Sequence, residues 1–360
     1  MFVFGVFLAR SLLSLKPTMA RLGERVSDGF ETLVRIFDSL DLEFAEKILS
    51  RGYRPKGSVG RPHRNLLGMF KVELVKRLEG VESYRELHRL LQTDEALRSL
   101  CEIKDCERPY GRSTLMRFRE KIGPKRLQRI MACLVKQLDQ KGVLDCETVA
   151  LDATFIEAYS RRDPEDSRRG YSDSDARLRK QGRNVTLGYG VHLAVDAGSE
   201  MPLAAIVEPA NVNEKKIAAS LLRKVLRGKR RAGSVVADSQ YSSKAFRDEA
   251  RRMGAEPVIP YPRNQMKGER VLRVDKRFRS HGPWRLKRVY RKRSAVERTV
   301  SRLKTYFGLC RLRTRGLRNV LSHVVLCLIA MLMTALSLTK NGFADKMRSP
   351  TFWSYLTCSK

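Results

Sequence analysis

Apolar residues in the first part of the chain recur at intervals of three and four positions. This spacing gives a helix one continuous apolar face and predicts helices over most of the range 27–142. The clearest runs are Leu33, Ile36, Phe37 and Leu40, followed by Leu66, Phe70, Leu74 and Leu78. A later helix is expected to begin with a cap at Ser113 and to stop at Gly123 and Pro124.

From Glu147 onward the apolar runs become short and rich in β-branched residues, which is typical of strands. Three strands joined by short links come first, and helix, strand, helix, strand and helix follow. This order predicts a mixed sheet with helices on its faces, which is an α/β fold. The strands are expected at 147–158, 188–198, 201–208, 234–239 and 255–260, and the helices between them at 214–226 and 242–253. The polar run 159–184 is interpreted as a loop.

These patterns divide the chain into four parts: 1–26, 27–142, 143–340 and 341–360. The first is an extension of uncertain nature, which resembles a signal h-region interrupted by Arg10, and Met19 is an alternative start to Met1. The second is a helical region whose many Arg and Lys favour a DNA-binding domain, with a plain helical bundle as the alternative. The third is the α/β domain, and the fourth is expected to be a C-terminal tail.

The range 320–338 is apolar and long enough to cross a bilayer. Polar residues interrupt it, including His323 and Thr334, so we interpret it as a buried helix of a soluble protein. Seven scattered cysteines form neither a disulfide framework nor a zinc site, which favours the cytoplasm.

Charge narrows the choice of partner. The chain has 72 Lys and Arg against 39 Asp and Glu, a net charge of +33 that is spread along its length. Such an excess favours a polyanion, because each neutralised phosphate releases counterions. Nucleic acid is the first candidate, and an anionic membrane surface or ribosome-type binding are weaker ones.

Three acids stand out against this basic background. Asp152 lies in the first strand, in VALDAT; Asp238 ends the fourth, in VVADSQY; and Glu297 lies in the basic run YRKRSAVERTVSRLK. A carboxylate among apolar strand neighbours is costly unless something pairs with it, and a divalent cation would do so. Oxygen ligands suit Mg²⁺ or Mn²⁺, and two such ions can activate a water or a 3′-hydroxyl.

The basic run supports this interpretation if it forms one helix from Tyr290 through Lys304. Tyr290, Arg293, Glu297 and Lys304 then fall within an arc about 60° wide, so a carboxylate is flanked by phosphate-binding groups. An alternative for Glu297 is a capping box with Ser294, since the two are spaced as S-x-x-E. The alternative for each aspartate is a hydrogen-bonding role in a turn.

The spacing Tyr-x2-Arg-x3-Glu-x6-Lys, without a gap here, resembles a motif of the DDE transposases of bacterial and archaeal insertion sequences, in the group spanning families four and five. LDATFIEA around Asp152 and ADSQYSS around Asp238 resemble the two aspartate blocks of that family. Gln240 stands where the family usually has Gly. The resemblance covers about 63–338, including the helical region.

This resemblance implies a ribonuclease H-like catalytic domain in which Asp152, Asp238 and Glu297 bind two Mg²⁺ or Mn²⁺ ions. Tyr290, Arg293 and Lys304 would contact DNA near the cleaved phosphate. The expected partners are the double-stranded terminal inverted repeats, target DNA and a second copy of the chain in a synaptic complex. No membrane partner is expected, and the protein would act at the nucleoid in a prokaryotic cytoplasm.

Other residues carry weaker signals. Trp284 is a candidate for stacking on an unpaired base, against the alternative of a packed Trp in a basic loop. His192 is interpreted as a structural histidine. Four aspartates of the polar run are expected to balance nearby arginines: Asp163, Asp166, Asp173 and Asp175. A non-catalytic DNA-binding relative of the transposases is the main alternative function, and a basic membrane-associated protein is a third.

Overall fold

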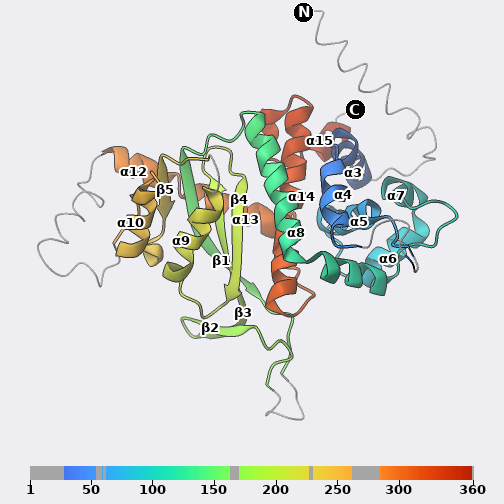
Figure 1. The fold of residues 1–360 in the computed structure, drawn as a ribbon, viewed down its shortest axis with the longest axis horizontal. Helices are drawn as coiled ribbons and strands as arrows, with labels where there is room; N and C mark the ends of the chain where they lie inside the picture. The colour runs from blue at the N-terminus through green and yellow to red at the C-terminus, as the bar shows by residue number, and fades with distance from the viewer. Residues whose placement is uncertain are drawn as a thin grey trace, which may run out of the picture.

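The computed structural model describes residues 28–53, 59, 62–162, 170–226, 230–261 and 284–358. Figure 1 shows the N-terminal helices on one side of the molecule and the sheet on the other. Two long helices, α8 (Arg112–Gln140) and α14 (Leu317–Lys340), run side by side between them. The predicted extension 1–26 lies outside the described residues.

The helical region contains the predicted amphipathic helices, and most of the predicted apolar positions are buried. Asn65, Ser83 and Asp94 cap the helices that follow them, each accepting a hydrogen bond from a backbone N–H. The elements are α3 (Asp28–Ser39), α4 (Glu43–Ser50), α5 (Leu66–Leu78), α6 (Tyr84–Thr93), α7 (Glu95–Leu100) and α8.

Two expectations for α8 are wrong. Gly111, not Ser113, is its N-cap residue, and no side chain makes a capping hydrogen bond there. The helix also does not stop at Gly123: that residue takes φ 64°, ψ 170°, and the chain resumes helical geometry at once. Pro124 suits the first position of the resumed helix, because its missing N–H would have no partner there in any case. The two predicted stop signals thus make a kink.

The sheet confirms the predicted fold class. Its main order is β4 (Pro202–Pro209), β3 (Asn184–Asp196), β1 (Thr148–Glu157), β5 (Ser234–Ala237) and β6 (Glu256–Val258). β1 and β4 are antiparallel to β3, whereas β5 is parallel to β1 and β6 is parallel to β5. This mixed sheet with helices on its faces, preceded by a helical region, is the predicted α/β architecture. The predicted loop 159–184 includes a further strand, β2 (Arg177–Gln181), which pairs with the start of β3.

Helices cover both faces of the sheet. α9 (Glu214–Val225) packs on β3 and β4, and α13 (Ser294–Thr305) packs on β1 and β3. Asp152 of β1 faces α13, where Arg293 approaches it. The next residue, Ala153, faces the other way and pairs with His192, so His192 lies on the opposite face, beside Tyr241. Also present are α10 (Lys244–Arg252), α12 (Trp284–Arg291) and a short 3₁₀ turn, η2 (Ser239–Tyr241).

α14 joins the two parts of the molecule, packing on α3, α5 and α8 on one side and on β4 and α13 on the other. It is the one helix in the described part of the chain that is long and apolar enough to cross a membrane. Of its most apolar window, 94% is buried inside the fold, as expected of a core helix.

The end of the chain is not the expected tail. After the short turn η4 (Ala344–Lys346), residues Phe352–Cys358 form α15, which packs on α3. Trp353 is buried there, and the guanidinium of Arg35 lies 5.2 Å from the centre of its ring. The C-terminus thus closes back onto the helical region, next to α3 in Figure 1.

Candidate active site

The register of β1 and β5 brings two of the three predicted acids together. Leu151 of β1 pairs with Ala237 of β5, so Asp152 and Asp238 are the next positions of two adjacent parallel strands. Residues in this relation point to the same face, about 5 Å apart between neighbouring strands. Both are half-buried. Asp152 accepts a hydrogen bond from the N–H of Ala153, and Asp238 accepts one from the hydroxyl of Ser239.

Glu297 reaches this pair through one arginine. Arg293 Nη2 lies 2.6 Å from Glu297 Oε1, and its Nη1 lies 3.8 Å from Asp152 Oδ2. One guanidinium group therefore spans the space between the carboxylate of α13 and the carboxylate of β1. The side chain of Glu297 is 50% exposed, whereas that of Asp152 is 25% exposed. The three acids lie around one shared edge that is open to solvent.

The helix that carries Glu297 differs from the single helix we expected. α12 ends at Arg291 and α13 begins at Ser294. Between them the hydrogen bonds tighten to the i→i−3 kind, as from the N–H of Arg293 to the carbonyl of Tyr290. Tyr290 thus lies in the last turn of α12, while Lys304 is exposed near the end of α13.

The capping-box alternative for Glu297 is wrong. Ser294 Oγ donates to the carbonyl of Arg291 and accepts from Arg298, so it does not cap the N–H of Glu297. The carboxylate of Glu297 pairs with Arg293 instead. Tyr290 belongs to the same group of side chains, since its ring centre lies 6.0 Å from the guanidinium carbon of Arg293.

A buried glutamate that sequence reasoning missed holds α13 against the sheet. Glu200, in the turn between β3 and β4, accepts charged hydrogen bonds from Arg298, at 2.8 Å, and from Arg302. Its carbonyl accepts from the hydroxyl of Thr299 at 2.9 Å. No local pattern signals this role, because Glu200 is a single acid in a Gly-Ser-Glu turn and its partners lie about a hundred residues away. The contacts fix the height and rotation of the helix that presents Glu297.

The three carboxylates repel any further negative charge at the site. Burial raises the pKa of Asp152, and the neighbouring Glu297 and Asp238 raise it further, while the Ala153 N–H and Arg293 oppose the shift. A cation placed among the three carboxylates would relieve this repulsion. Carboxylate oxygens are the donors that Mg²⁺ and Mn²⁺ prefer, so the chemistry of the set fits such an ion.

In the structure the three carboxylates do not yet form a closed metal-binding site. Within the described residues, no group of three His, Cys, Asp or Glu side chains is close enough to hold a metal ion. Arg293 occupies the gap between Asp152 and Glu297, and its charge partly satisfies both. Closing the three acids around a cation therefore requires the Arg293 side chain to leave.

Trp284 and His192 are the remaining candidates from the sequence. Trp284 begins α12, but its side chain lies outside the described residues. His192 is buried, with its Nδ1 3.1 Å from the hydroxyl of Tyr241, and burial lowers its pKa to about 4. It lies on the face away from Asp152, which agrees with its interpretation as a structural histidine.

Two aspartates of the polar run do something other than balance arginines. Asp173 and Asp175 accept hydrogen bonds from the N–H groups of Gly316 and Leu317, at 3.2 and 2.8 Å, and so cap the start of α14. Asp173 is buried and also accepts from the hydroxyl of Tyr189. Asp163 and Asp166 lie outside the described residues.

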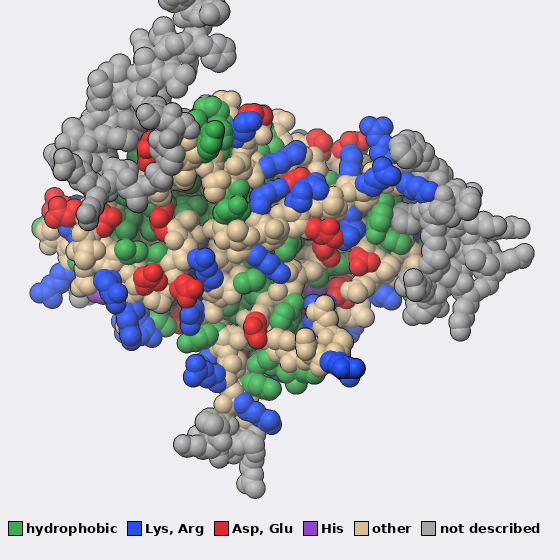
Figure 2. Space-filling model, turned by 180° about the vertical axis from the view of Figure 1, so that it is seen from behind, with side chains coloured by type: hydrophobic (Ala, Val, Ile, Leu, Met, Phe, Trp, Pro, Cys, Tyr) green, Lys and Arg blue, Asp and Glu red, His purple; other side chains and the backbone are tan. Residues whose placement is uncertain are grey.

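On the face shown in Figure 2, Lys and Arg side chains are interspersed with acids and apolar side chains rather than gathered in one block. The net charge thus acts as a general attraction, and specific anion sites must come from local geometry.

Comparisons with known proteins show which family the chain resembles. Residues 146–333 match a family model described as a transposase DDE domain, and residues 21–121 match one described as a transposase domain (DUF772). Among solved structures, the chain is similar to a piggyBac transposase in a synaptic complex with hairpin DNA. That match has a TM-score of 0.38 and 10% sequence identity, and it covers 94% of this chain and 84% of the other. No curated protein matches the chain.

Proposed function

Because the chain belongs to the transposase DDE-domain family and is a metal-dependent DNA transposase, we propose the following reaction. It cleaves the terminal inverted repeats of an insertion sequence and joins the freed 3′-hydroxyl ends to target DNA. Both steps are phosphoryl transfers at one site formed by Asp152, Asp238 and Glu297. The observation that carries this assignment is the convergence of β1, β5 and α13, with one guanidinium spanning from Asp152 to Glu297.

We assign the binding of two Mg²⁺ or Mn²⁺ ions to the same three carboxylates. When bound, such ions supply an activated oxygen nucleophile and stabilise the oxygen that leaves. The chain itself holds Asp152 and Asp238 side by side on adjacent strands and brings Glu297 in from a helix fixed by Glu200.

Arg293, Tyr290 and Lys304 are proposed to bind DNA. Arg293 pairs with carboxylates in the structure, and a guanidinium fork binds phosphate equally well. Its transfer from the acids to a DNA phosphate would open the metal site and fix the substrate in one movement. Lys304 is exposed near the end of α13 and extends the positive surface along the DNA.

The helical region, α3 to α8, is proposed to bind the element ends as a DNA-binding domain within residues 27–142. Two ends must meet before they are joined, so a homodimer in a synaptic complex is the expected working form. Such a protein acts in the cytoplasm at the nucleoid, and the burial of α14 within the fold agrees with that location.

The test uses the purified full chain and a plasmid that carries the element's inverted repeats. Nicking at the repeat ends is expected with Mg²⁺ or Mn²⁺ and not with a chelator, and an Asp238→Asn variant should bind the same DNA without nicking it. Binding without nicking by the unaltered protein in both metals would favour the non-catalytic alternative. Equal nicking by the variant would remove Asp238 from the site.

A further inference from the structure

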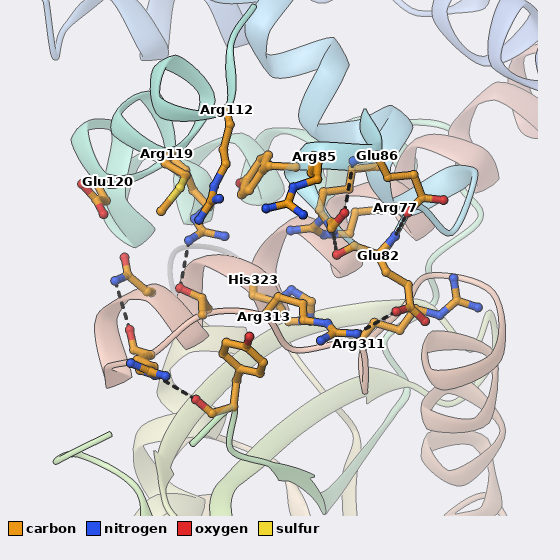
Figure 3. Close-up of a pocket in the computed structure, with 18 residues that line it drawn as sticks. Arg77, Glu82, Arg85, Glu86, Arg112, Arg119, Glu120, Arg311, Arg313 and His323 are labelled. Atoms are coloured by element: carbon orange, nitrogen blue, oxygen red, sulfur yellow. Dashed lines mark hydrogen bonds and ion pairs between the residues drawn. The ribbon is translucent and has the colours of Figure 1, made fainter. Parts of the chain in front are cut away.

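A second concave site lies where the helical region meets the sheet domain, and it is strongly basic (Figure 3). It is a cavity of about 680 Å³ with walls from α5, α6, α8, the end of β1 and the segment 306–316 that precedes α14. Eight of its lining residues are Lys or Arg and three are Glu. Its volume lies in the range of small-ligand sites, and its excess of positive charge favours an anion.

The cavity walls are fixed by contacts between distant segments. Arg313 Nη2 lies 2.9 Å from Glu82 Oε2, which ties the segment 306–316 to the helical region. Arg315 Nε donates to the carbonyl of Tyr159 at 3.1 Å, which ties it to the end of β1. Arg119 of α8 donates to the hydroxyl of Thr314 at 2.8 Å. These contacts hold the cavity open before any ligand arrives.

Three arginines in this frame have unused hydrogen-bonding capacity. Arg85 and Arg112 are exposed, and the side chain of neither makes a hydrogen bond or ion pair within the described part of the chain. Arg119 is 6% exposed, and its Nε has no hydrogen-bond partner among the described residues. In Figure 3 the side chains of all three extend into the same space. A buried donor without a partner is costly, so a ligand that accepts from it is favoured.

The chemistry of the three groups selects phosphate. Guanidinium forks bind phosphate oxygens bidentately, and several forks around one space suit a tetrahedral anion or a chain of them. Tyr159 stands at the rim, 44% exposed, with the guanidinium carbons of Arg313 and Arg315 each 5.6 Å from its ring centre. An aromatic ring beside phosphate-binding groups fits a nucleotide better than an inorganic anion.

The position of the cavity relates it to the catalytic acids. Tyr159 follows the strand that carries Asp152, seven residues farther along the chain. A strand rises about 3.3 Å per residue, and β1 ends at Glu157 before a bend at Tyr159, so the two lie at most about 23 Å apart. A DNA duplex advances about 3.4 Å per base pair, so a duplex that follows β1 covers this distance in about seven base pairs.

We propose that the cavity binds the sugar–phosphate backbone of the element-end DNA through Arg85, Arg112 and Arg119, at most about seven nucleotides from the cleaved phosphate. The inference rests on the proposed function and adds a DNA contact that both domains build together. One strand end, one loop and three helices of the helical region, α5, α6 and α8, must be in place to form it. DNA bound there is therefore held by the helical region and the catalytic domain at once.

The experiment measures DNA binding without cleavage, in metal-free buffer, with a fluorescent duplex carrying the terminal inverted repeat. The double variant Arg85→Gln, Arg112→Gln is expected to bind at least about ten-fold more weakly than the unaltered chain. The slope of log affinity against log salt should fall by about two, because each lost phosphate contact contributes about 0.9. Phosphate ethylation near the seventh nucleotide should interfere with binding by the unaltered chain and not by the variant.

The matched control is Arg89→Gln, Arg129→Gln, which removes two exposed charges from the same two helices outside the cavity. It should keep both the affinity, within about three-fold, and the ethylation signal, with a slope change below that of the cavity variant. Equal binding and equal slope for both variants would overturn the inference and leave the proposed function standing. No binding by the unaltered chain would overturn both.

The source of the phosphate is tested with inorganic tripolyphosphate and with ATP. If DNA is the ligand, these compounds should compete only weakly with the duplex. Micromolar binding of either compound that is lost in the cavity variant, with DNA binding unchanged, would assign the cavity to a free phosphate compound and reject the DNA backbone.

Discussion

The carboxylate site and the basic cavity are opposite solutions to the same electrostatic problem. At the first, three acids meet in a chain of net charge +33, and Arg293 lies between two of them. At the second, eight cations meet with only three glutamates. Each gathers like charges that repel one another, and each is relieved by a ligand of the other sign. Such frustration is affordable at a binding site because the ligand removes it.

The largest expected effects separate the two sites completely. Asp152→Asn should lower cleavage by about 10³-fold or more, since metal binding contributes several kcal/mol to the transition state. It should leave DNA affinity within about three-fold, because it removes no phosphate contact. The measurement pairs a nicking assay with DNA-binding anisotropy on the same preparation. A variant that lost DNA binding as well would show that the two sites are not independent.

The sites also differ in how firmly their supports are buried. Glu200, whose side chain is 4% exposed, joins α13 to the sheet, whereas the pair of Glu82 and Arg313 at the cavity is about half exposed. Glu200→Gln is expected to lower the free energy of unfolding by about 3 kcal/mol, since it removes the buried counter-charge of Arg302, which is 14% exposed, and of the half-exposed Arg298. Glu82→Gln should cost less than about 1 kcal/mol.

Denaturant unfolding of the two variants measures this contrast, with Asp345→Asn as a control in an exposed pair of the C-terminal segment. Equal losses for Glu200 and Glu82 would mean that the segment 306–316 is anchored as firmly as α13. The comparison then fails, and the cavity counts as part of the rigid core.

The two sites were not equally visible in the sequence. Tyr290, Arg293, Glu297 and Lys304 lie within fifteen residues, so fixed spacing could reveal them. Asp152 and Asp238 could be singled out because each lies in or at the end of a predicted strand. Neighbouring parallel strands place such residues side by side. The cavity draws its arginines from separate segments that are sequence-distant, as Arg112 and Arg313 are. No local pattern reports such a convergence.

The same limit explains the local errors. Glu200 reads as an ordinary turn residue because its partners are contributed by α13, about one hundred positions later. Gly123 and Pro124 carry a correct local signal, a break in helical geometry, but packing of α8 against α14 restores the helix beyond it. Ser294 matches a cap by spacing, yet the tight turn after Arg291 gives its hydroxyl a different partner.

A smaller effect is expected when the Arg293 guanidinium is removed from between the acids. Arg293→Gln leaves Asp152 and Glu297 without their shared positive partner. The protein should bind Mn²⁺ about ten-fold more tightly, the equivalent of about one pKa unit of charge interaction, and should be less stable without metal. Isothermal titration with Mn²⁺ and metal-free thermal unfolding measure the two consequences.

Arg298→Gln is the control for Arg293→Gln, since Arg298 lies in α13, which Arg293 immediately precedes, and pairs with Glu200 instead. It should lower stability without tightening metal binding. Unchanged Mn²⁺ affinity in Arg293→Gln would show that the guanidinium does not compete with metal, and its role would then be limited to DNA.

The smallest expected effect is a pH dependence at the basic cavity. Burial, helped by Arg77 and Arg119 and opposed by Glu73, lowers the pKa of Lys76 to about 7. Without ligand, the folded chain therefore loses the Lys76 proton near pH 7, whereas the unfolded chain keeps it to about pH 10.5. The contribution of Lys76 to the free energy of unfolding therefore rises with pH between these values.

A bound phosphate favours the protonated form of Lys76, so DNA should bind more tightly as pH falls through 7. Between pH 8 and pH 6 the affinity of the unaltered chain should rise about three-fold more than that of Lys76→Met, a difference worth about 0.7 kcal/mol. DNA anisotropy at the two pH values measures it, with thermal unfolding to confirm that Lys76→Met is folded. If Lys76→Met shows the same pH response as the unaltered chain, that response belongs to groups other than Lys76. Of the two sites, only the acidic one would then bind a ligand that changes the protonation of a buried group.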